Sequence, residues 1–399
     1  MGSRSGRIIE MIEEEVREIP ADEFSEEEGL LLHRLYGKQI GVEFPGPLTG
    51  AHFRLHSRGF VGQFPLGKGV QLRIRPKVPV GNLFAMLEHA YGLGGSNWED
   101  GTIAVETIPQ VFEFLAYVLA RRTLARVQGG LFQEYAELEE EIPWVKGRLL
   151  PPWPRRSAAA GLRCRFPEQT ADLMDNRILV WTLFGLRSFP FTRPEVRGEV
   201  GRASRLLAKR VAPTPVAPED CEGRNYHRLN HDYRLLHGLC RFFLEQGGPN
   251  LGEGRGELMP FSLHMPTLFE KFVAEWFRMH LLADWEVRTQ HRVPLEGSGR
   301  LAFKVDLALQ ERRTGRTVAV LDTKYKRGPG PEERDIQQVV AYAVRMGTDT
   351  AFLVYPTPDR ELQRLKVGPV NIHLLGFDLS GDLDRAGREV GGKLRKNLS

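Results

Sequence analysis

Two strand-like runs on either side of a short polar loop constrain the fold of this chain more than any other feature. The first run carries Asp306, the second carries Asp322 and Lys324, and the loop between them is centred on Thr314. Gly315 suits the left-handed third position of a three-residue hairpin loop. The sequence therefore predicts two antiparallel strands joined by this loop.

The predicted hairpin brings two carboxylates together. Folding about Thr314 places Asp306 opposite Asp322, because both residues are equally far from the centre of the loop. Directly opposed residues have Cβ atoms about 4.5–5.5 Å apart, which lets two carboxylates share one divalent ion. Asp322 and Lys324 are two residues apart, so their side chains project from the same face of the strand. Two acids and an amine on one face indicate metal-assisted phosphodiester hydrolysis.

A solvated hairpin face with an ordinary Asp–Lys pair is the alternative interpretation, because the pattern is short and common. The local context favours a site. The run Val318-Ala319-Val320-Leu321 is apolar on both faces, as in a strand that is covered on both sides. A carboxylate at the end of such a strand is costly to bury without a cation nearby. Hard oxygen ligands of this kind suit Mg²⁺, which keeps several of its waters.

Composition sets wider bounds. The 399 residues are enough for two or three domains, and a formal net charge of +4 does not by itself identify a nucleic-acid-binding protein. Basic residues do gather in one segment, which could follow a phosphate backbone or simply form a solvated helix face. They are Arg187, Arg193, Arg197, Arg202, Arg205, Lys209 and Arg210.

The cysteines and the N-terminus indicate a cytoplasmic protein. Cys164, Cys221 and Cys240 are odd in number and widely spaced, which predicts neither a disulfide framework nor a zinc site. Acidic residues interrupt the first apolar run, so it lacks a signal core, and no run approaches the length of a membrane span. We therefore expect no membrane partner.

Apolar periodicity, a helix-capping pattern and a proline-rich stretch divide the first two thirds of the chain into predicted elements. A capping-box pattern at Ser25 and Glu28 opens a predicted helix that runs to Tyr36. Strands are predicted over 53–56 and 70–77, and helices over 83–91, 108–127, 172–184 and 226–244. The stretch Pro151-Pro152-Trp153-Pro154 breaks regular structure. We expect three regions, namely 1–152, 153–260 and 261–399.

The segment from Gly62 to Gly69 matches the sequence motif of a phosphate-binding P-loop at every position but the last. Its last position is Gly69, where Ser or Thr would have to hold Mg²⁺. A strand-like run follows it instead of a helix. We therefore expect a structural hairpin turn here, and no nucleotide triphosphate bound by this chain.

The last region has the clearest order of elements. A helix over 268–282 precedes a strand over 285–292 and the two strands of the hairpin. A second helix over 331–346 is followed by strands over 351–355 and 370–377. This order predicts a mixed sheet flanked by helices, within an overall α+β or mixed α/β fold.

Asp306, the run Asp322-Thr323-Lys324 and this order of elements resemble the PD-(D/E)xK nuclease superfamily, with Val305 where that pattern usually has Pro. From about Phe53 onward the chain also resembles the McrC family, through several weak motifs in a specific order. These motifs are Ile74-Arg75-Pro76-Lys77, 83–87, Val145-Lys146-Gly147-Arg148-Leu149, Asp175-Asn176-Arg177-Ile178-Leu179, 226–240, 268–273 and the D-x-x-Q-x-x-x-Y pattern from Asp335 to Tyr342.

The resemblance implies a function within a complex. McrC is the nuclease subunit of the McrBC modification-dependent restriction system, a form of phage defence. Its partner McrB is a hexameric AAA+ GTPase that binds GTP, recognises double-stranded DNA with methylated cytosine, such as 5-methylcytosine, and translocates that DNA. The N-terminal part of McrC docks on the partner and stimulates GTP hydrolysis. We therefore expect a nuclease core preceded by a docking region of strands and helices.

The resemblance also implies roles for the residues of the hairpin. Asp306 and Asp322 bind Mg²⁺, or Mn²⁺ in its place, together with the backbone carbonyl of Thr323. Lys324 positions or activates the attacking water and offsets the charge that builds up on the phosphate.

Two helical residues are weaker candidates. Glu270 stands where the superfamily often has a further acid, and Gln338 lies where it could touch the attacking water or the DNA backbone. A solvated helix surface explains either residue equally well.

Three functions remain open at this point. The first is a catalytic endonuclease subunit that acts within a GTPase complex. The second is a stand-alone nuclease of the same superfamily that acts in repair or on DNA junctions. The third is a non-catalytic activator of an AAA+ motor, which the intact set of Asp306, Asp322 and Lys324 argues against.

Overall fold

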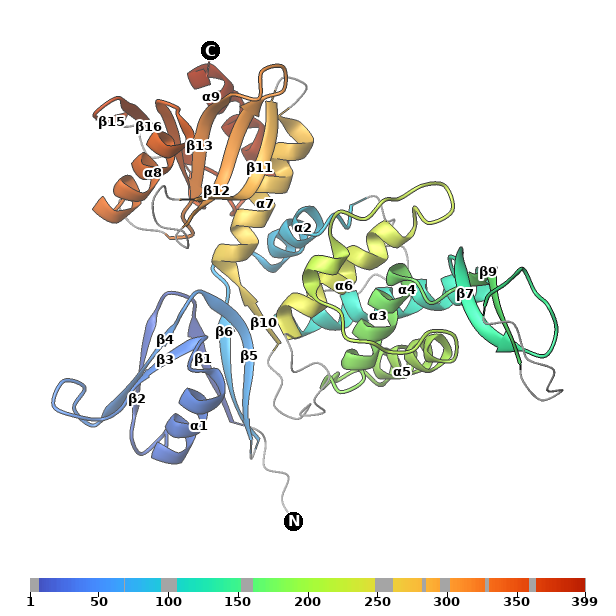
Figure 1. Cartoon of the computed structure of the whole chain (residues 1–399). Helices are drawn as coiled ribbons and strands as arrows, with labels where there is room; N and C mark the ends of the chain where they lie inside the picture. The colour runs from blue at the N-terminus through green and yellow to red at the C-terminus, as the bar shows by residue number, and fades with distance from the viewer. Residues whose placement is uncertain are drawn as a thin grey trace. The chain divides into compact units, whose positions relative to one another are not determined.

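The structure of the chain is a computed structural model that describes residues 7–67, 69–94, 106–151, 161–247, 261–281, 285–294, 302–326, 330–358 and 364–398. The chain divides into two compact units (Figure 1). The first unit combines Met1–Phe112 with Leu258–Ser399, and the second is Glu113–Glu257. This division differs from the expected boundary at residue 152, because residues 7–94 belong to the same unit as the C-terminal region, whereas residues 113–151 belong to the second unit.

Two small sheets form the N-terminal part of the first unit. One has the order β2-β4-β3, and the other has the order β1-β6-β5-β10. The predicted helix is present as α1 (Glu26–Tyr36), and Ser25 and Glu28 form the expected capping box. The remaining elements are β1 (Arg7–Ile12), β2 (Val16–Pro20), β3 (Ile40–Glu43), β4 (His52–Ser57), β5 (Phe60–Gly67), β6 (Val70–Arg75), α2 (Val80–Ala90) and β10 (Phe261–His264).

The segment that resembles a P-loop is a β-hairpin. Its two sides, β5 and β6, are antiparallel neighbours, with Gly62 paired to Ile74 and Gly67 to Val70. Gly67 and Gly69 both have positive φ, of 76° and 78°, a conformation that glycine adopts without steric cost. The prediction of a structural hairpin turn is confirmed, and Lys68 lies outside the described residues.

A six-stranded mixed sheet forms the C-terminal part of the first unit, in the order β11-β12-β13-β14-β16-β15. The strands β13, β14 and β16 run parallel, and the others pair antiparallel. This confirms the predicted mixed sheet, while the edge strand β15 and the last helix were not predicted. The elements are α7 (Met265–His280), β11 (Trp285–Pro294), β12 (Ala302–Glu311), β13 (Thr317–Thr323), α8 (Glu333–Met346), β14 (Thr350–Tyr355), β15 (Leu365–Val367), β16 (Val370–Gly376) and α9 (Leu383–Leu398).

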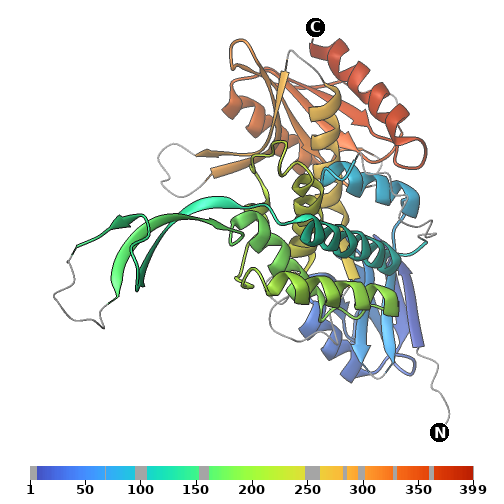
Figure 2. The same cartoon turned by 90° about the vertical axis from the view of Figure 1, so that its right-hand side faces the viewer.

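Helices cover this sheet on both faces (Figures 1 and 2). One core forms where α8 packs on the central strands, with Val320, Leu353 and Ile372 facing Val339 and Ala343 of the helix. Successive residues of a strand point to opposite faces. Asp322 therefore shares the face of Val320, on the side of the sheet that α8 covers. This places the expected site at the end of β13, next to α8.

The second unit consists of helices and a long three-stranded ribbon, β7-β9-β8. Figure 2 shows this ribbon extending away from the helices of its own unit. The elements are α3 (Ile108–Gly129), which begins in the first unit, β7 (Glu134–Ile142), β8 (Arg148–Leu149), β9 (Leu162–Thr170), α4 (Met174–Leu186), α5 (Pro194–Ala208), a 3₁₀ turn (Pro218–Cys221) and α6 (Tyr233–Gly247).

One helix of the second unit begins later than the sequence predicts. We expected a helix from Tyr226, but α6 begins at Tyr233. The side chain of Asn230 explains the difference, since it accepts a hydrogen bond from the backbone N–H of His227 at 2.7 Å and donates one to the carbonyl of Asn225 at 3.2 Å. Asn side chains that bond to the local backbone in this way favour turns over helices.

Over the part of the chain that the structure describes, no helix combines the length and the apolar character that crossing a membrane requires.

Candidate active site

The loop of the β12–β13 hairpin is one residue longer than expected. Gly315 donates to the carbonyl of Glu311 at 2.8 Å, and Glu311 donates to the carbonyl of Arg316 at 2.9 Å. Four residues therefore lie between the closing pair, Glu311 and Arg316. Gly315 has a φ of 71°, so it adopts the left-handed conformation that the sequence predicts, at the last position of the loop.

A β-bulge offsets the extra loop residue. Gln310 pairs with Thr317, whereas Leu309 pairs with Ala319, so the register shifts by one residue between them. Beyond the bulge the register continues to the pair Leu307–Leu321. One further step along both strands sets Asp306 opposite Asp322.

The Asp322 carboxylate is a buried group with an elevated proton affinity. Asp322 has no exposed surface. Burial, and after it the charge of the facing Asp306 carboxylate, raise the pKa of Asp322 to about 7, although the Lys324 ammonium opposes both effects. Asp306 Oδ2 in turn accepts a hydrogen bond from the backbone N–H of Thr323 at 3.3 Å. Two carboxylates thus face each other at the ends of neighbouring strands.

Lys324 is held between the strand end and α8. Its Nζ lies 2.7 Å from Asp322 Oδ2 and donates to Gln338 Oε1 at 2.9 Å. The side-chain amide of Gln338 in turn donates to the Tyr342 hydroxyl at 2.7 Å. Because Gln338 bonds to both groups, α8 fixes the direction in which the ammonium points.

Glu270 approaches the same region from α7. Burial raises the pKa of the Tyr342 hydroxyl, and the charges of Asp306, Asp322 and Glu270 raise it further. Glu270 is therefore within electrostatic reach of the residue that holds Gln338. The structure thus brings Asp306, Asp322, Lys324 and Gln338 into contact, with Glu270 near them, whereas the ligand role of the Thr323 carbonyl stays a prediction.

A second ion cluster beside the site was not predicted. Lys326 Nζ lies 2.5 Å from Asp335 Oδ2 and 2.8 Å from Glu332 Oε1. Asp335 also accepts a hydrogen bond from the Glu332 backbone N–H at 3.0 Å, and its Oδ1 lies 3.9 Å from Lys324 Nζ. Two features of the sequence could have predicted this cluster. Lys324 and Lys326 are two residues apart, and Asp335 lies in the first turn of the following helix, α8.

The donor set at the strand ends is compatible with Mg²⁺. Among the described residues, no group of three or more His, Cys, Asp or Glu side chains could hold a metal. The Asp306–Asp322 pair supplies two carboxylates, and within the described structure Oδ1 of Asp322 is buried without a hydrogen-bond partner. An ion that keeps several waters and takes only one or two protein carboxylates matches this arrangement better than an ion that needs a protein cage.

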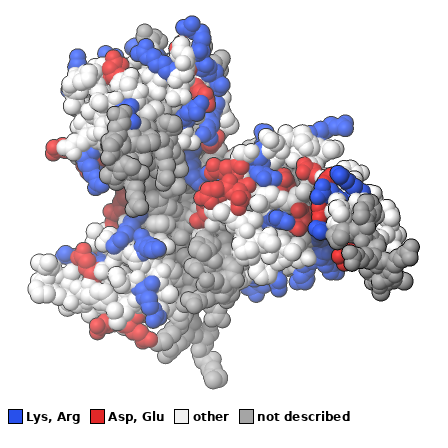
Figure 3. Space-filling model, viewed as in Figure 1, with Lys and Arg blue, Asp and Glu red and all other residues white. Residues whose placement is uncertain are grey.

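Basic side chains gather on the exposed face of α5 in the second unit. Arg202, Arg205 and Lys209 are exposed and follow one another at intervals of three and four residues, so they share one face. Figure 3 shows Lys and Arg side chains along the lower edge of this unit, where α5 lies. This face matches the basic segment that the sequence singles out.

Comparison with known proteins relates the chain to a restriction system. The type IV methyl-directed restriction enzyme EcoKMcrBC of Escherichia coli (strain K12) is 23% identical over 342 residues, which are 76% of this chain and 94% of that protein. A structure of Thermococcus gammatolerans McrB AAA+ hexamers with bound McrC, a half-complex of a tetradecameric assembly, contains a chain with 18% identity and a TM-score of 0.55. This match covers 98% of the present chain and 100% of that chain.

A cryo-EM structure of the Thermococcus gammatolerans McrBC complex also matches, with 20% identity and a TM-score of 0.45, over 70% of this chain and 89% of that chain. A sequence model of one family, described as "McrBC 5-methylcytosine restriction system component", matches residues 55–356. The resemblance to McrC is thereby confirmed. Because this match spans more than half of the 399 residues, the chain belongs to the family of McrBC 5-methylcytosine restriction system components.

Proposed function

We propose that this chain is the Mg²⁺-dependent endodeoxyribonuclease subunit of a GTP-dependent restriction complex that cuts DNA with modified cytosine. One observation carries the proposal. Two carboxylates, Asp306 and Asp322, face each other at the ends of neighbouring strands, and the Lys324 ammonium lies 2.7 Å from the second of them. Burial and the charge of Asp306 raise the pKa of Asp322, and a divalent cation bound between the two carboxylates would offset both effects.

The residues of the proposed site would have different roles in the reaction. Asp306 and Asp322, with the Thr323 carbonyl, would hold Mg²⁺. When bound, this ion would polarise the scissile phosphate and lower the pKa of a water bound to it. Lys324 keeps a fixed positive charge at the position where negative charge develops on the phosphate, which stabilises the transition state without any reorganisation. Gln338 holds that ammonium in place.

Glu270 is a further acidic residue of the proposed site. Its charge raises the pKa of the Tyr342 hydroxyl, as do the charges of Asp306 and Asp322, so all three acids lie within electrostatic reach of that hydroxyl. We propose that it reaches the metal through a water molecule. Substitution of Glu270 by Gln would then weaken Mg²⁺ binding without abolishing it.

The partner would supply recognition and movement along DNA. The relatives named above include an assembly of McrB AAA+ hexamers with bound McrC, and we propose a partner of that kind for this chain. GTP would be bound by the partner, because the segment 62–69 of this chain is a β-hairpin and not a phosphate-binding loop. The N-terminal region within 1–152 is the proposed docking region.

The exposed face of α5 is the proposed contact with the DNA backbone. Arg202 pairs with Glu199 at 2.9 Å. Within the described parts of the chain, Arg205 and Lys209 have no ion pair that would neutralise them. Cations on one helix face attract phosphates without regard to sequence. This surface would therefore strengthen DNA binding but would not select a sequence.

The test is a cleavage assay with the full chain, a McrB-like AAA+ GTPase as the proposed partner, GTP, Mg²⁺ and methylated duplex DNA. We expect the wild type to cut and Asp322→Ala to assemble with the partner but not to cut. Undiminished cleavage by Asp322→Ala would overturn the proposed site. Cutting by the wild-type chain without any GTPase would favour a stand-alone nuclease, and failure to bind Mg²⁺ or Mn²⁺ would favour a non-catalytic activator.

A further inference from the structure

Tyr325 connects the proposed nuclease site to a distant part of the same unit. It follows Lys324 directly, and the backbone turns tightly around it, because Lys326 donates to the carbonyl of Lys324 at 2.9 Å. The lysines on either side of it pair with Asp322 and Asp335. The Tyr325 hydroxyl instead donates to Glu13 Oε1 at 2.8 Å.

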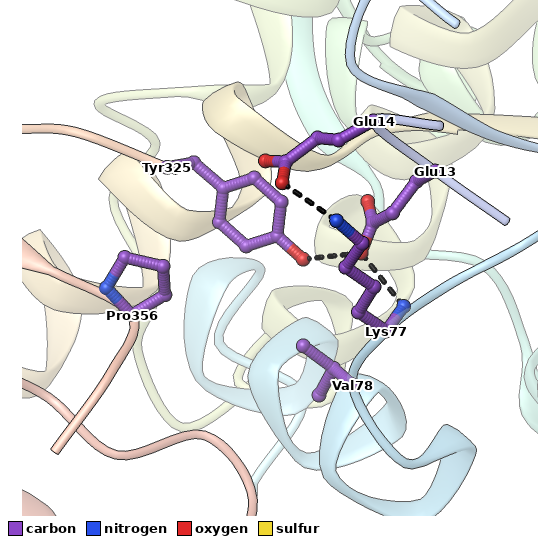
Figure 4. A pocket seen from close by; sticks show the side chains of 6 residues that line it. All are labelled: Glu13, Glu14, Lys77, Val78, Tyr325 and Pro356. Atoms are coloured by element: carbon purple, nitrogen blue, oxygen red, sulfur yellow. Dashed lines mark hydrogen bonds and ion pairs between the residues drawn. The ribbon is translucent and has the colours of Figure 1, made fainter. Parts of the chain in front are cut away.

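Glu13 lies in the turn between β1 and β2 and is almost completely buried, with 1% of its surface exposed. Its Oε1 accepts a second hydrogen bond from the Lys77 backbone N–H at 2.7 Å. Figure 4 shows Tyr325 and Lys77 converging on this carboxylate in a pocket that Glu14, Val78 and Pro356 complete. The carboxylate therefore joins three separate segments of the first unit.

The arrangement around Glu13 is energetically costly. Its Oε2 is buried and has no hydrogen-bond partner among the described residues, and burial raises the pKa of the carboxyl. The neighbouring Glu14 has a φ of 63°, which is uncommon for a residue other than glycine. Such costs persist where the surrounding structure holds the group, and they cluster at functional sites.

Tyr325 is also fixed from other directions. Its ring packs on the ring of Phe269 of α7, with a centroid distance of 5.8 Å. Phe269 is the residue before Glu270 in the sequence. The backbone N–H of Lys324 donates to the carbonyl of Val354 at 2.8 Å. The chain that leaves β13 is thus held by β14 on one side and by Glu13 on the other, and the Lys324 side chain projects from between these two anchors.

We propose that Glu13 is a positioning residue for the nuclease site, which it controls by holding Tyr325 and thereby the turn that carries Lys324. This inference rests on the proposed nuclease function. A displacement of about 1 Å at a reacting group can reduce a rate by as much as about a hundredfold. Loss of the Glu13–Tyr325 hydrogen bond would therefore lower the cleavage rate, although neither residue lies at the metal.

The test compares four variants of the full chain in a complex with the proposed McrB-like GTPase partner, GTP, Mg²⁺ and methylated DNA. Tyr325→Phe removes only the hydroxyl that reaches Glu13. Glu13→Ala removes the acceptor, and Glu13→Gln keeps an oxygen that accepts both hydrogen bonds. Tyr36→Phe is the matched control, because the hydroxyl of Tyr36 donates to the Pro65 carbonyl, also at 2.8 Å, in the same unit.

We expect Tyr325→Phe and Glu13→Ala to lower the maximal cleavage rate by about tenfold to a hundredfold. Glu13→Gln and Tyr36→Phe should cut at close to the wild-type rate. The Mg²⁺ concentration for half-maximal rate should stay unchanged in Tyr325→Phe, because both metal carboxylates remain. Should Glu13→Ala fail to fold, the comparison of Tyr325→Phe with Tyr36→Phe still decides the question.

Three outcomes separate this inference from the proposed function. A wild-type complex that does not cut would overturn the proposed function, and this inference with it. A wild type that cuts while Tyr325→Phe cuts equally fast would overturn the positioning role alone. Equal losses in Tyr325→Phe and Tyr36→Phe would also overturn it, because a general loss of stability would then explain both.

Discussion

Lys324 Nζ lies 2.7 Å from Asp322 Oδ2, although Asp322 has no exposed surface. The two residues are separated by one position on the same strand end, so strand alternation places them on one face. A buried carboxylate is costly unless a cation or hydrogen bonds compensate it. The ammonium supplies part of that compensation, and the raised pKa of Asp322 indicates that part of the cost remains. A divalent ion between Asp306 and Asp322 would remove that remainder.

The carboxylate pair should make the metal-free protein sensitive to pH. Since the folded chain holds the Asp322 proton up to about pH 7, against a reference value of 3.8, it binds more protons than the unfolded chain between these values. Its stability should therefore fall as pH rises through this window. Asp322→Asn lacks this effect, so in EDTA its melting temperature should exceed that of the wild type by more at pH 8 than at pH 5.

Differential scanning fluorimetry at both pH values measures this difference. Each kcal/mol corresponds to about 2–4 °C in a domain of this size. Added Mg²⁺ should raise the melting temperature of the wild type and have little effect on Asp322→Asn. An equal offset between the two proteins at pH 5 and pH 8 would contradict the prediction.

Substitution of Lys324 should separate metal binding from catalysis. Lys324→Gln leaves both carboxylates in place and removes the charge that we expect to stabilise the transition state, so cleavage should fall by about 10²–10³-fold. Mn²⁺ affinity, measured by calorimetry on the same variant, should fall much less, or rise, because the competing ammonium is gone. A variant that keeps the wild-type rate would exclude a catalytic role for Lys324.

The neighbouring glutamines of α8 offer a matched test of how Lys324 is held. Gln338 accepts a hydrogen bond from the Lys324 ammonium. The exposed Gln337 instead donates a hydrogen bond to the Glu333 carboxylate at 3.0 Å. Gln338→Ala should lower the cleavage rate by roughly tenfold, and Gln337→Ala should leave it unchanged. Both substitutions have a similar effect on helix propensity, so equal rates for the two variants would show that Gln338 is ordinary helix surface.

The basic face of α5 should contribute to DNA affinity without sequence preference. Replacing Arg202, Arg205 and Lys209 with Gln should weaken binding and lower the slope of log K against log salt by about 2–3, since each lost phosphate contact contributes about 0.9. Fluorescence anisotropy with labelled duplexes at several salt concentrations measures this slope.

The control for α5 makes the same charge change on α9. Arg385, Arg388 and Lys396 are exposed there, and their replacement with Gln should leave the slope close to its wild-type value. If both triple variants lose the same slope, the effect comes from the net charge of the protein and not from α5.

The sequence by itself determined the local parts of this protein. The capping box at Ser25, the left-handed Gly315 and the mixed sheet depend on neighbouring residues or on apolar periodicity, and all three are present in the structure. The start of α6 was predicted wrongly, because apolar periodicity does not report the hydrogen bonds by which Asn230 holds the turn before it.

The tertiary structure alone decided how the site is completed. The hairpin loop has an extra residue, and the opposition of Asp306 and Asp322 is restored only by a bulge that forms as β13 packs between β12 and β14. Glu13 and Tyr325 are 312 residues apart, and Gln338 meets Lys324 only because α8 packs on the sheet. Local patterns predict which chemical groups are available, but contacts between distant segments arise from the packing of whole elements, which no short window of sequence contains.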